Sequence, residues 1–262
     1  MMKKFFYRVV LFIIFAFLIL PMLSMVIWAF FSNWGATDIL PNSFTFAGFN
    51  YFFASKDWYI GIKSTIFSME VALVATIISI MVSRYLISIN IKSKNTLESI
   101  FYLPMLLPVI SVCLGSHKLF LQSPISSTFA LLILHIYFSL PYAFKMTYSY
   151  YSIWGVEEEL TARGLGASFW QAFRYINIPI YIQGYIGSFI MAFIISYSQY
   201  FINLFIGNHN NINFSMIMTP YIANSNRNIA AVYTLMYIFY GVVVMILTSL
   251  MGKNIARKKS LW

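Results

Sequence analysis

Long apolar runs separated by short polar segments organise this chain. A helix of about 20 apolar residues is long enough to cross the roughly 30 Å of hydrocarbon in a bilayer. Six stretches reach that length, and we expect spans near residues 9–31, 62–87, 99–121, 129–149, 181–205 and 229–251. The pattern predicts an all-α, polytopic membrane protein that forms a single transmembrane domain over residues 1–262. A further short helix is expected near 214–222, within an Asn-rich connecting segment.

The composition agrees with a chain whose solvent is largely lipid. Of the 262 residues, 60% are hydrophobic and 9% are charged, and the mean hydropathy is +0.77. Soluble domains carry about 25% charged residues. The polar residues left here are too few to cover a core of this size, so a water-soluble globular protein is excluded.

The distribution of positive charge predicts the orientation. There are 17 Lys and Arg residues against 7 Asp and Glu, and the cations lie mostly between the apolar runs. Lipid phosphates are therefore their expected partners, and nucleic acid is not. With both termini in the cytoplasm, the outer side holds only Lys56, Lys63, Lys118 and Arg227. Because basic loops stay in the cytoplasm, we expect six spans with the N- and C-termini inside.

The chain lacks the short motifs of common catalytic sites. It contains no G-x-x-x-x-G-K-[ST] phosphate loop, no H-E-x-x-H and no G-x-S-x-G sequence. Cys113 is the single cysteine, so a thiolate metal cluster is excluded. We therefore expect no enzyme activity, no metal and no cofactor in this chain, and any energy source must lie in another protein.

The most patterned connecting segment runs over residues 156–179, on the predicted cytoplasmic side. Three acids at 157–159 favour the start of a helix, because the helix dipole stabilises negative charge there. Glu159 is four residues before Arg163, which predicts an ion pair along the helix. We expect this first helix to end near Gly166.

A second helix is predicted directly afterwards. Ser168 and Gln171 have the spacing of a capping box, and Pro179 suits the first turn of the fifth span. The result is a helix-Gly-helix elbow at the membrane surface. From the residues alone, a plain connector with its aromatic side chains in the lipid interface is an equally good interpretation.

The elbow resembles the EAA loop of permease subunits of ABC importers, which reads Glu-Ala-Ala, three residues, Gly, nine residues and Ile-x-Leu-Pro. From Gly166, nine residues lead to Ile176, and the tail is Ile-Asn-Ile-Pro, ending at Pro179. The head departs from the pattern, because Leu160 stands where the first acid belongs and the acid is at Glu159. That shift leaves open whether Glu159 replaces the missing glutamate.

The resemblance extends along the chain. The Tyr-Leu-Pro-Met-Leu-Leu-Pro run at 102–108, His135 with Leu-Pro-Tyr at 140–142, and residues 196–200 are similar to one branch of these permeases. That branch includes the spermidine/putrescine, thiamine, iron and phosphonate permeases. The similarity covers most of the chain and indicates the family better than it indicates the solute.

The resemblance implies a multi-protein importer in a bacterial cytoplasmic membrane. Its partners would be two ABC ATPases that bind ATP and Mg²⁺, a second permease subunit in a heterodimer, and an extracytoplasmic solute-binding protein. The expected solute is small and polar, such as a polyamine. The coupling residues would be Glu159, Ala162, Gly166, Ala167, Ser168 and Pro179. A stand-alone secondary transporter and a membrane assembly factor are the alternatives.

Candidate path residues lie on polar faces of the spans. In the fifth span, small and polar residues recur at three- and four-residue steps and form one stripe. Glu70 should face protein or water, with an ion pair to Lys63 as its structural interpretation. A buried hydrogen bond is the corresponding interpretation for His135. The candidates for the path are Ser196, Gln199, Asn203, His135 and Glu70.

Overall fold

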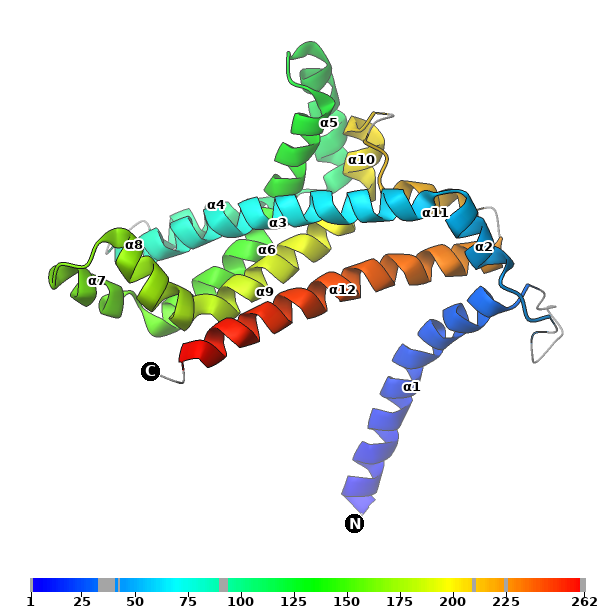
Figure 1. Ribbon diagram of the computed structural model, residues 1–262, viewed down its shortest axis with the longest axis horizontal. Coiled ribbons are helices and arrows are strands. Elements are labelled where there is room, and N and C mark those ends of the chain that lie inside the picture. Colours follow the sequence, from blue (N-terminus) through cyan, green and yellow to red (C-terminus); the bar gives the residue numbers. More distant parts are fainter. Residues whose placement is uncertain are drawn as a thin grey trace. The chain divides into compact units, whose positions relative to one another are not determined.

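Helices form nearly all of the part of the chain that the structure describes. The computed structural model describes residues 2–32, 41, 43–89, 94–208, 211–223 and 226–259 (Figure 1). Within these residues the extended structure is one isolated bridge between Phe31 and Phe44. The prediction of an all-α protein is therefore confirmed.

The helices follow one another along the chain with short connections. They are α1 (Met2–Phe30), α2 (Ala47–Ala54), α3 (Asp57–Ser88), α4 (Lys94–Leu106), α5 (Val109–Gln122), α6 (Ser127–Trp154), α7 (Glu157–Gly164), α8 (Phe169–Ala172), the π-helix η1 (Phe173–Asn177), α9 (Ile178–Tyr197), α10 (Tyr200–Ile206), α11 (Phe214–Ala223) and α12 (Arg227–Lys259). The short helix expected near 214–222 is α11. Contacts group the chain into two compact units, Met1–Ile62 with Phe214–Tyr240 and Lys63–Asn213 with Gly241–Trp262.

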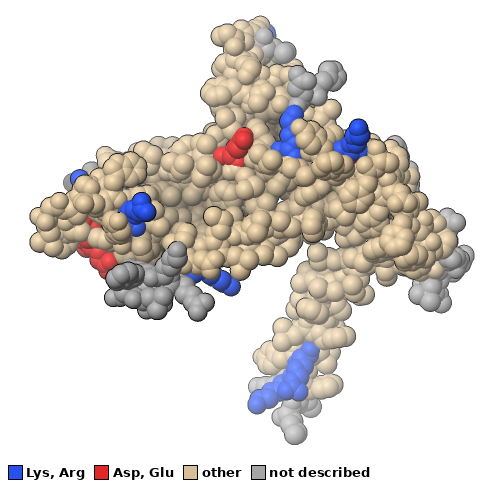
Figure 2. Space-filling model, in the orientation of Figure 1, with Lys and Arg blue, Asp and Glu red and all other residues tan. Residues whose placement is uncertain are grey.

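Five helices of the described chain are long and apolar enough to cross a membrane. The pair α4 and α5 makes a sixth if it is one broken span. The face in Figure 2 carries only isolated charged side chains on an otherwise uncharged surface. These features are those of a polytopic helical membrane protein, and the predicted orientation remains a prediction.

The span expected at 99–121 is broken rather than continuous. Helices α4 and α5 meet at a bend of 91°. Pro108 caps α5 in an extended conformation, with ψ 123°. Proline lacks the N–H that would continue the helix, and its ring disfavours helical geometry at the residue before it. The apolar pattern predicts an apolar helical segment here, but it does not predict the break within it.

The span expected at 181–205 also differs. Its helical run begins earlier, at Phe169, and continues through η1 into α9. It is interrupted at its other end, where Gln199 is extended, with ψ 91°, before α10 begins. The Asn203 side chain donates to the Gln199 carbonyl at 2.5 Å. A polar side chain thus satisfies backbone that the helix leaves open.

In the unit that contains Lys63–Asn213, α6 and α9 lie side by side, as Figure 1 shows. Gly184 of α9 lies against the Tyr150 ring, and a Cβ there would come within 2.7 Å of it. Such close approach of small residues is how helices pack in lipid. Helix α3 places polar residues inward, and Ser83 shares a hydrogen bond of 2.8 Å with Thr147 of α6.

The other unit has an aromatic core of its own. Phe52 of α2, Phe214 of α11 and Tyr233 of α12 are buried together. The Asn228 side-chain amide donates to backbone carbonyls at the end of α1, including that of Trp28 at 3.0 Å. An asparagine here satisfies carbonyls that a helix end leaves without partners.

Candidate functional site

The elbow begins with α7, whose last turn closes at a glycine. Gly166 has φ 98°, a conformation that residues with a Cβ rarely adopt. Its N–H donates to the Arg163 carbonyl at 3.1 Å, and the Ala167 N–H donates to the Ala162 carbonyl at 3.0 Å. These two bonds form a Schellman motif, the common termination of a helix at glycine. The bend at Gly166 is therefore built from backbone hydrogen bonds.

The second half of the elbow starts where the sequence predicts it. The Ser168 N–H donates to Oε1 of Gln171 at 2.8 Å, and the Gln171 N–H donates to Oγ of Ser168 at 3.3 Å. The capping box is confirmed. The π-helix η1 follows and places Pro179 in the first turn of α9. A wider π turn just before a proline accommodates the missing N–H without ending the helical run.

Glu159 is the buried centre of the elbow. Its side chain is 1% exposed and pairs with Arg84 of α3. Arg84 approaches with two nitrogens: Nε donates to Oε2 at 2.8 Å, and Nη2 donates to Oε1. The Asn177 side-chain amide of η1 donates to Oε2 as well. We call these three residues the brace, because they join α3, α7 and η1.

The prediction of an ion pair between Glu159 and Arg163 is wrong. Arg84 is the partner, while the Arg163 guanidinium lies over the Phe169 ring at 6.0 Å from its centre. Glu159 faces the interior of the bundle, where a planar guanidinium can bind a carboxylate with two bonds. Arg163 lies on the exposed side of α7 and does not reach it.

Two opposing effects act on the Glu159 carboxyl. Burial disfavours its charged form, but the hydrogen bonds from Arg84 and Asn177 favour that form more, so its pKa lies below the ordinary value. A carboxyl with a lowered pKa in the folded state stabilises the fold above its ordinary pKa. That stabilisation is lost as the pH falls through the lowered value. At neutral pH the brace is fully charged.

The other predicted coupling residues surround the brace. Ala162, Ala167 and Pro179 are half-buried, whereas Gly166 and Ser168 are exposed. The predicted set thus runs from α7 through the bend to the first turn of α9, and Glu159 is its buried member. The sequence did not mark Arg84 or Asn177. The one available signal was the arginine near the end of the second predicted span.

Three of the predicted path residues form a buried network. His135 Nδ1 and Ser196 Oγ are 2.9 Å apart, and the Asn203 amide donates to His135 Nε2 at 3.1 Å. Since Nε2 accepts, the assigned proton lies on Nδ1 and is donated to Ser196. Gln199 joins through its carbonyl, which accepts from Asn203. The break between α9 and α10 is therefore held by side chains of the predicted path.

Glu70 is not part of that network. It is exposed near the middle of α3, on the face opposite the buried serines and threonines. The expected pair between Glu70 and Lys63 stays a prediction. Seven residues of helix rise about 10 Å, which separates the two side chains by two turns.

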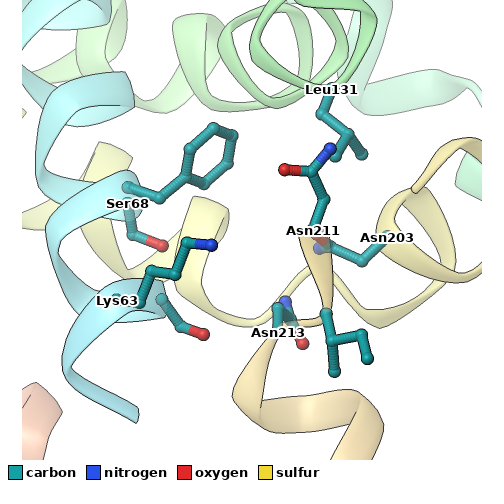
Figure 3. A pocket seen from close by; sticks show the side chains of 9 residues that line it. Lys63, Ser68, Leu131, Asn203, Asn211 and Asn213 are labelled. Carbon is teal, nitrogen blue, oxygen red and sulfur yellow. The ribbon is translucent and has the colours of Figure 1, made fainter. Parts of the chain in front are cut away.

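A cavity of about 50 Å³ lies next to the network (Figure 3). The Lys63 ammonium points into it from α3, and Asn203 and Asn213 face it from the other side. Its lining comprises Lys63, Ser64, Phe67, Ser68, Leu131, Asn203, Asn211, Ile212 and Asn213. Of these residues, only Asn203 was predicted from the sequence to line the path. The density of asparagines after residue 207 was a signal for the others, although it is equally typical of a plain loop.

Comparison with known proteins decides the family. Residues 75–261 match the family described as binding-protein-dependent transport system inner membrane component. The chain belongs to this permease family. The match includes the elbow, the brace and most of the residues that line the cavity.

Three relatives from Salmonella carry the same description, putative 2-aminoethylphosphonate transport system permease protein PhnV. The chain is 25% identical to that of Salmonella paratyphi A over 193 residues, 72% of this chain and 71% of the relative. It is 28% identical over 174 residues to those of Salmonella typhi and Salmonella typhimurium. These two alignments cover 65% of this chain and 65% and 64% of the relatives' own length.

We expect the permease to lose stability when the brace loses its charge. Glu159→Gln keeps the shape of the side chain but leaves Arg84 without an anion. The loss should be about 1.5–3 kcal/mol, the range for hydrogen bonds to charged groups. Thermal unfolding in detergent measures it. Glu158→Gln, on the exposed side of α7, is the matched control and should change stability by less than about 0.5 kcal/mol. Equal unfolding temperatures for Glu159→Gln and the unsubstituted chain would contradict the brace.

Proposed function

We propose that this chain is the permease subunit of an ATP-driven ABC importer and that its elbow docks on a cytoplasmic ATPase subunit. The observation that carries the proposal is the elbow itself, a rigid bend in a chain of the binding-protein-dependent permease family. ATP and Mg²⁺ are bound by the ATPase. A second permease subunit completes the path, and an extracytoplasmic binding protein delivers the solute.

The outer surface of the elbow has the character of a docking surface. Leu165 at the bend is 86% exposed, Trp170 is 73% exposed and Tyr175 is 69% exposed. Large apolar side chains grouped on a segment outside the spans mark an interaction site. Their grouping around Gly166 favours a protein partner over a random position in the lipid interface, because the bend presents Leu165 away from the bundle.

Coupling in this proposal is mechanical. The ATPase dimer closes on ATP and moves the elbow, and the elbow moves the helices to which it is joined. The brace supports this role, since it fixes α7 and η1 to α3 with a buried ion pair. No covalent step is assigned to a residue of this chain. The permease supplies a path that exists in two states, and its elbow switches the path from one state to the other.

The cavity supports an anionic group on the solute. Of the nine described residues that line it, Lys63 alone carries a charge. A polyamine, which the sequence led us to expect, would bring positive charge beside the Lys63 ammonium, and like charges repel. The relatives are described as permeases for 2-aminoethylphosphonate, which carries an anionic phosphonate. We therefore propose a small solute with an anionic head in place of a polyamine.

The elbow's docking is tested at Gly166, where a Cβ would meet nothing within 4 Å of the chain itself. Gly166→Ala introduces the strain of a positive φ, about 1–2 kcal/mol, but little bulk. Gly166→Trp carries the same backbone strain and adds a large side chain, so the difference between the two variants reports the bulk. We expect Gly166→Trp to abolish transport and the ATP hydrolysis stimulated by the binding protein, and Gly166→Ala to retain a substantial part of both. Membrane levels of both variants are measured in the same samples.

Gly164→Trp is the control, because its Cβ also meets nothing in this chain and its backbone is helical. It separates bulk at the bend from bulk elsewhere on α7. Transport by Gly166→Trp at the level of Gly166→Ala, in membranes that contain equal amounts of each, would contradict docking at the bend.

Lys63 tests the solute class. Removing the charge with Lys63→Gln should weaken uptake of 2-aminoethylphosphonate about tenfold in apparent affinity, which corresponds to about 1.4 kcal/mol. Lys118→Gln, an exposed lysine of α5, should leave uptake unchanged. Competition assays with radiolabelled solute measure both variants. Competition by putrescine or spermidine at the concentrations at which the phosphonate competes would overturn the anionic-head proposal.

A further inference from the structure

We infer that Arg84 is a positioning residue of the transport cycle: by holding Glu159 it fastens the elbow to α3, so that movement of the elbow reaches the cavity along this helix. The inference rests on the proposed function, because it requires an elbow that an ATPase moves. It adds a second route for that movement. The first route is the direct continuation of the elbow into α9.

Arg84 contacts both halves of the elbow. It pairs with Glu159 of α7, and its guanidinium lies 5.3 Å from the centre of the Phe169 ring of α8. Arg84 and Glu159 are 75 positions apart in the chain, so this link is purely tertiary. Helices α6 and α9 follow the motion of the elbow through the backbone, whereas α3 follows it through this contact.

Glu159 serves this link instead of docking. With 1% of its side chain exposed, the carboxylate lies beyond the reach of a partner, and its two oxygens accept from Arg84 and Asn177 of the same chain. Leu160 takes the outward position on α7 and is 48% exposed. The shift of the acid by one residue thus turns it from the outer face of the helix to the inner face.

Helix α3 is suited to carry movement over the required distance. It runs without proline or glycine from Lys63 to Arg84, a rise of about 30 Å. Its first turns in this unit supply four residues of the cavity lining: Lys63, Ser64, Phe67 and Ser68. Of the other helices that line the cavity, α10 is separated from α9 by the break at Gln199, and α6 contributes Leu131 alone and contains Pro141.

Nucleotide-dependent labelling of the cavity tests the inference. The assembled importer would carry Cys113→Ser and Ser68→Cys, a change of similar size at a position that is 3% exposed and lines the cavity. A small polar thiol reagent is applied without nucleotide and after trapping with ATP and vanadate. We expect labelling rates to differ at least fivefold between the two states. Arg84→Gln should reduce that difference to less than twofold.

Two further variants keep the test decisive. Arg84→Lys retains the charge but not the two-pronged geometry, so it should keep an intermediate difference, and it carries the test if Arg84→Gln reaches the membrane in low amounts. Lys145→Gln removes an exposed cation of α6 outside the elbow and the brace and should behave as the unsubstituted importer. A full labelling difference in both Arg84 variants would overturn the inference.

Failure of the inference is distinguishable from failure of the proposed function. In the same preparations, Leu165→Cys is cross-linked to the ATPase subunit. A cross-link in every variant, together with unchanged labelling differences, would refute the role of Arg84 and leave docking intact. Absence of the cross-link in the importer with an intact brace would instead refute docking, and with it the basis of the inference.

Discussion

A single buried ion pair organises the elbow of this permease. Removing a carboxylate from water is costly unless its partners replace the lost hydration. Around Glu159, Arg84 supplies two donors and Asn177 a third. The position of α7 against α3 follows from that requirement. So does the placement of η1, because Asn177 must stay within hydrogen-bonding distance of the same carboxylate.

The rest of the described structure follows from lipid as solvent. In α3 the serines and threonines face other helices, while Ile66, Leu73 and Ile77 are exposed. Irregular backbone at membrane depth is tolerated only where protein or a cavity satisfies it. The break between α9 and α10 obeys this rule, since Asn203 and Asn213 donate to the Gln199 carbonyl. The same asparagines face the cavity, so the break and the candidate path coincide.

Local signals in the sequence predict much of this structure. Apolar run length marks the spans, the Ser168–Gln171 spacing marks a capping box, and Gly166 marks the bend, because each depends on residues a few positions apart. The brace depends on residues 75 positions apart, and nothing local distinguishes Arg84 from an ordinary interfacial arginine. The length of an apolar run does not locate the breaks in the third and fifth predicted spans. Hydropathy averages over a window, whereas a break is decided by one proline or one asparagine side chain.

The central claim is that the elbow and α3 move as one body, and a distance measurement tests it most directly. Spin labels are placed at Leu165 and Tyr85, which are 86% and 59% exposed, in the assembled importer. Pulsed electron paramagnetic resonance then gives the distance between them without nucleotide and after trapping with ATP and vanadate. The account predicts one narrow distance that is the same in both states, and a broad distribution in the Glu159→Gln background. A shift of several ångströms between the two states with the brace intact would contradict it.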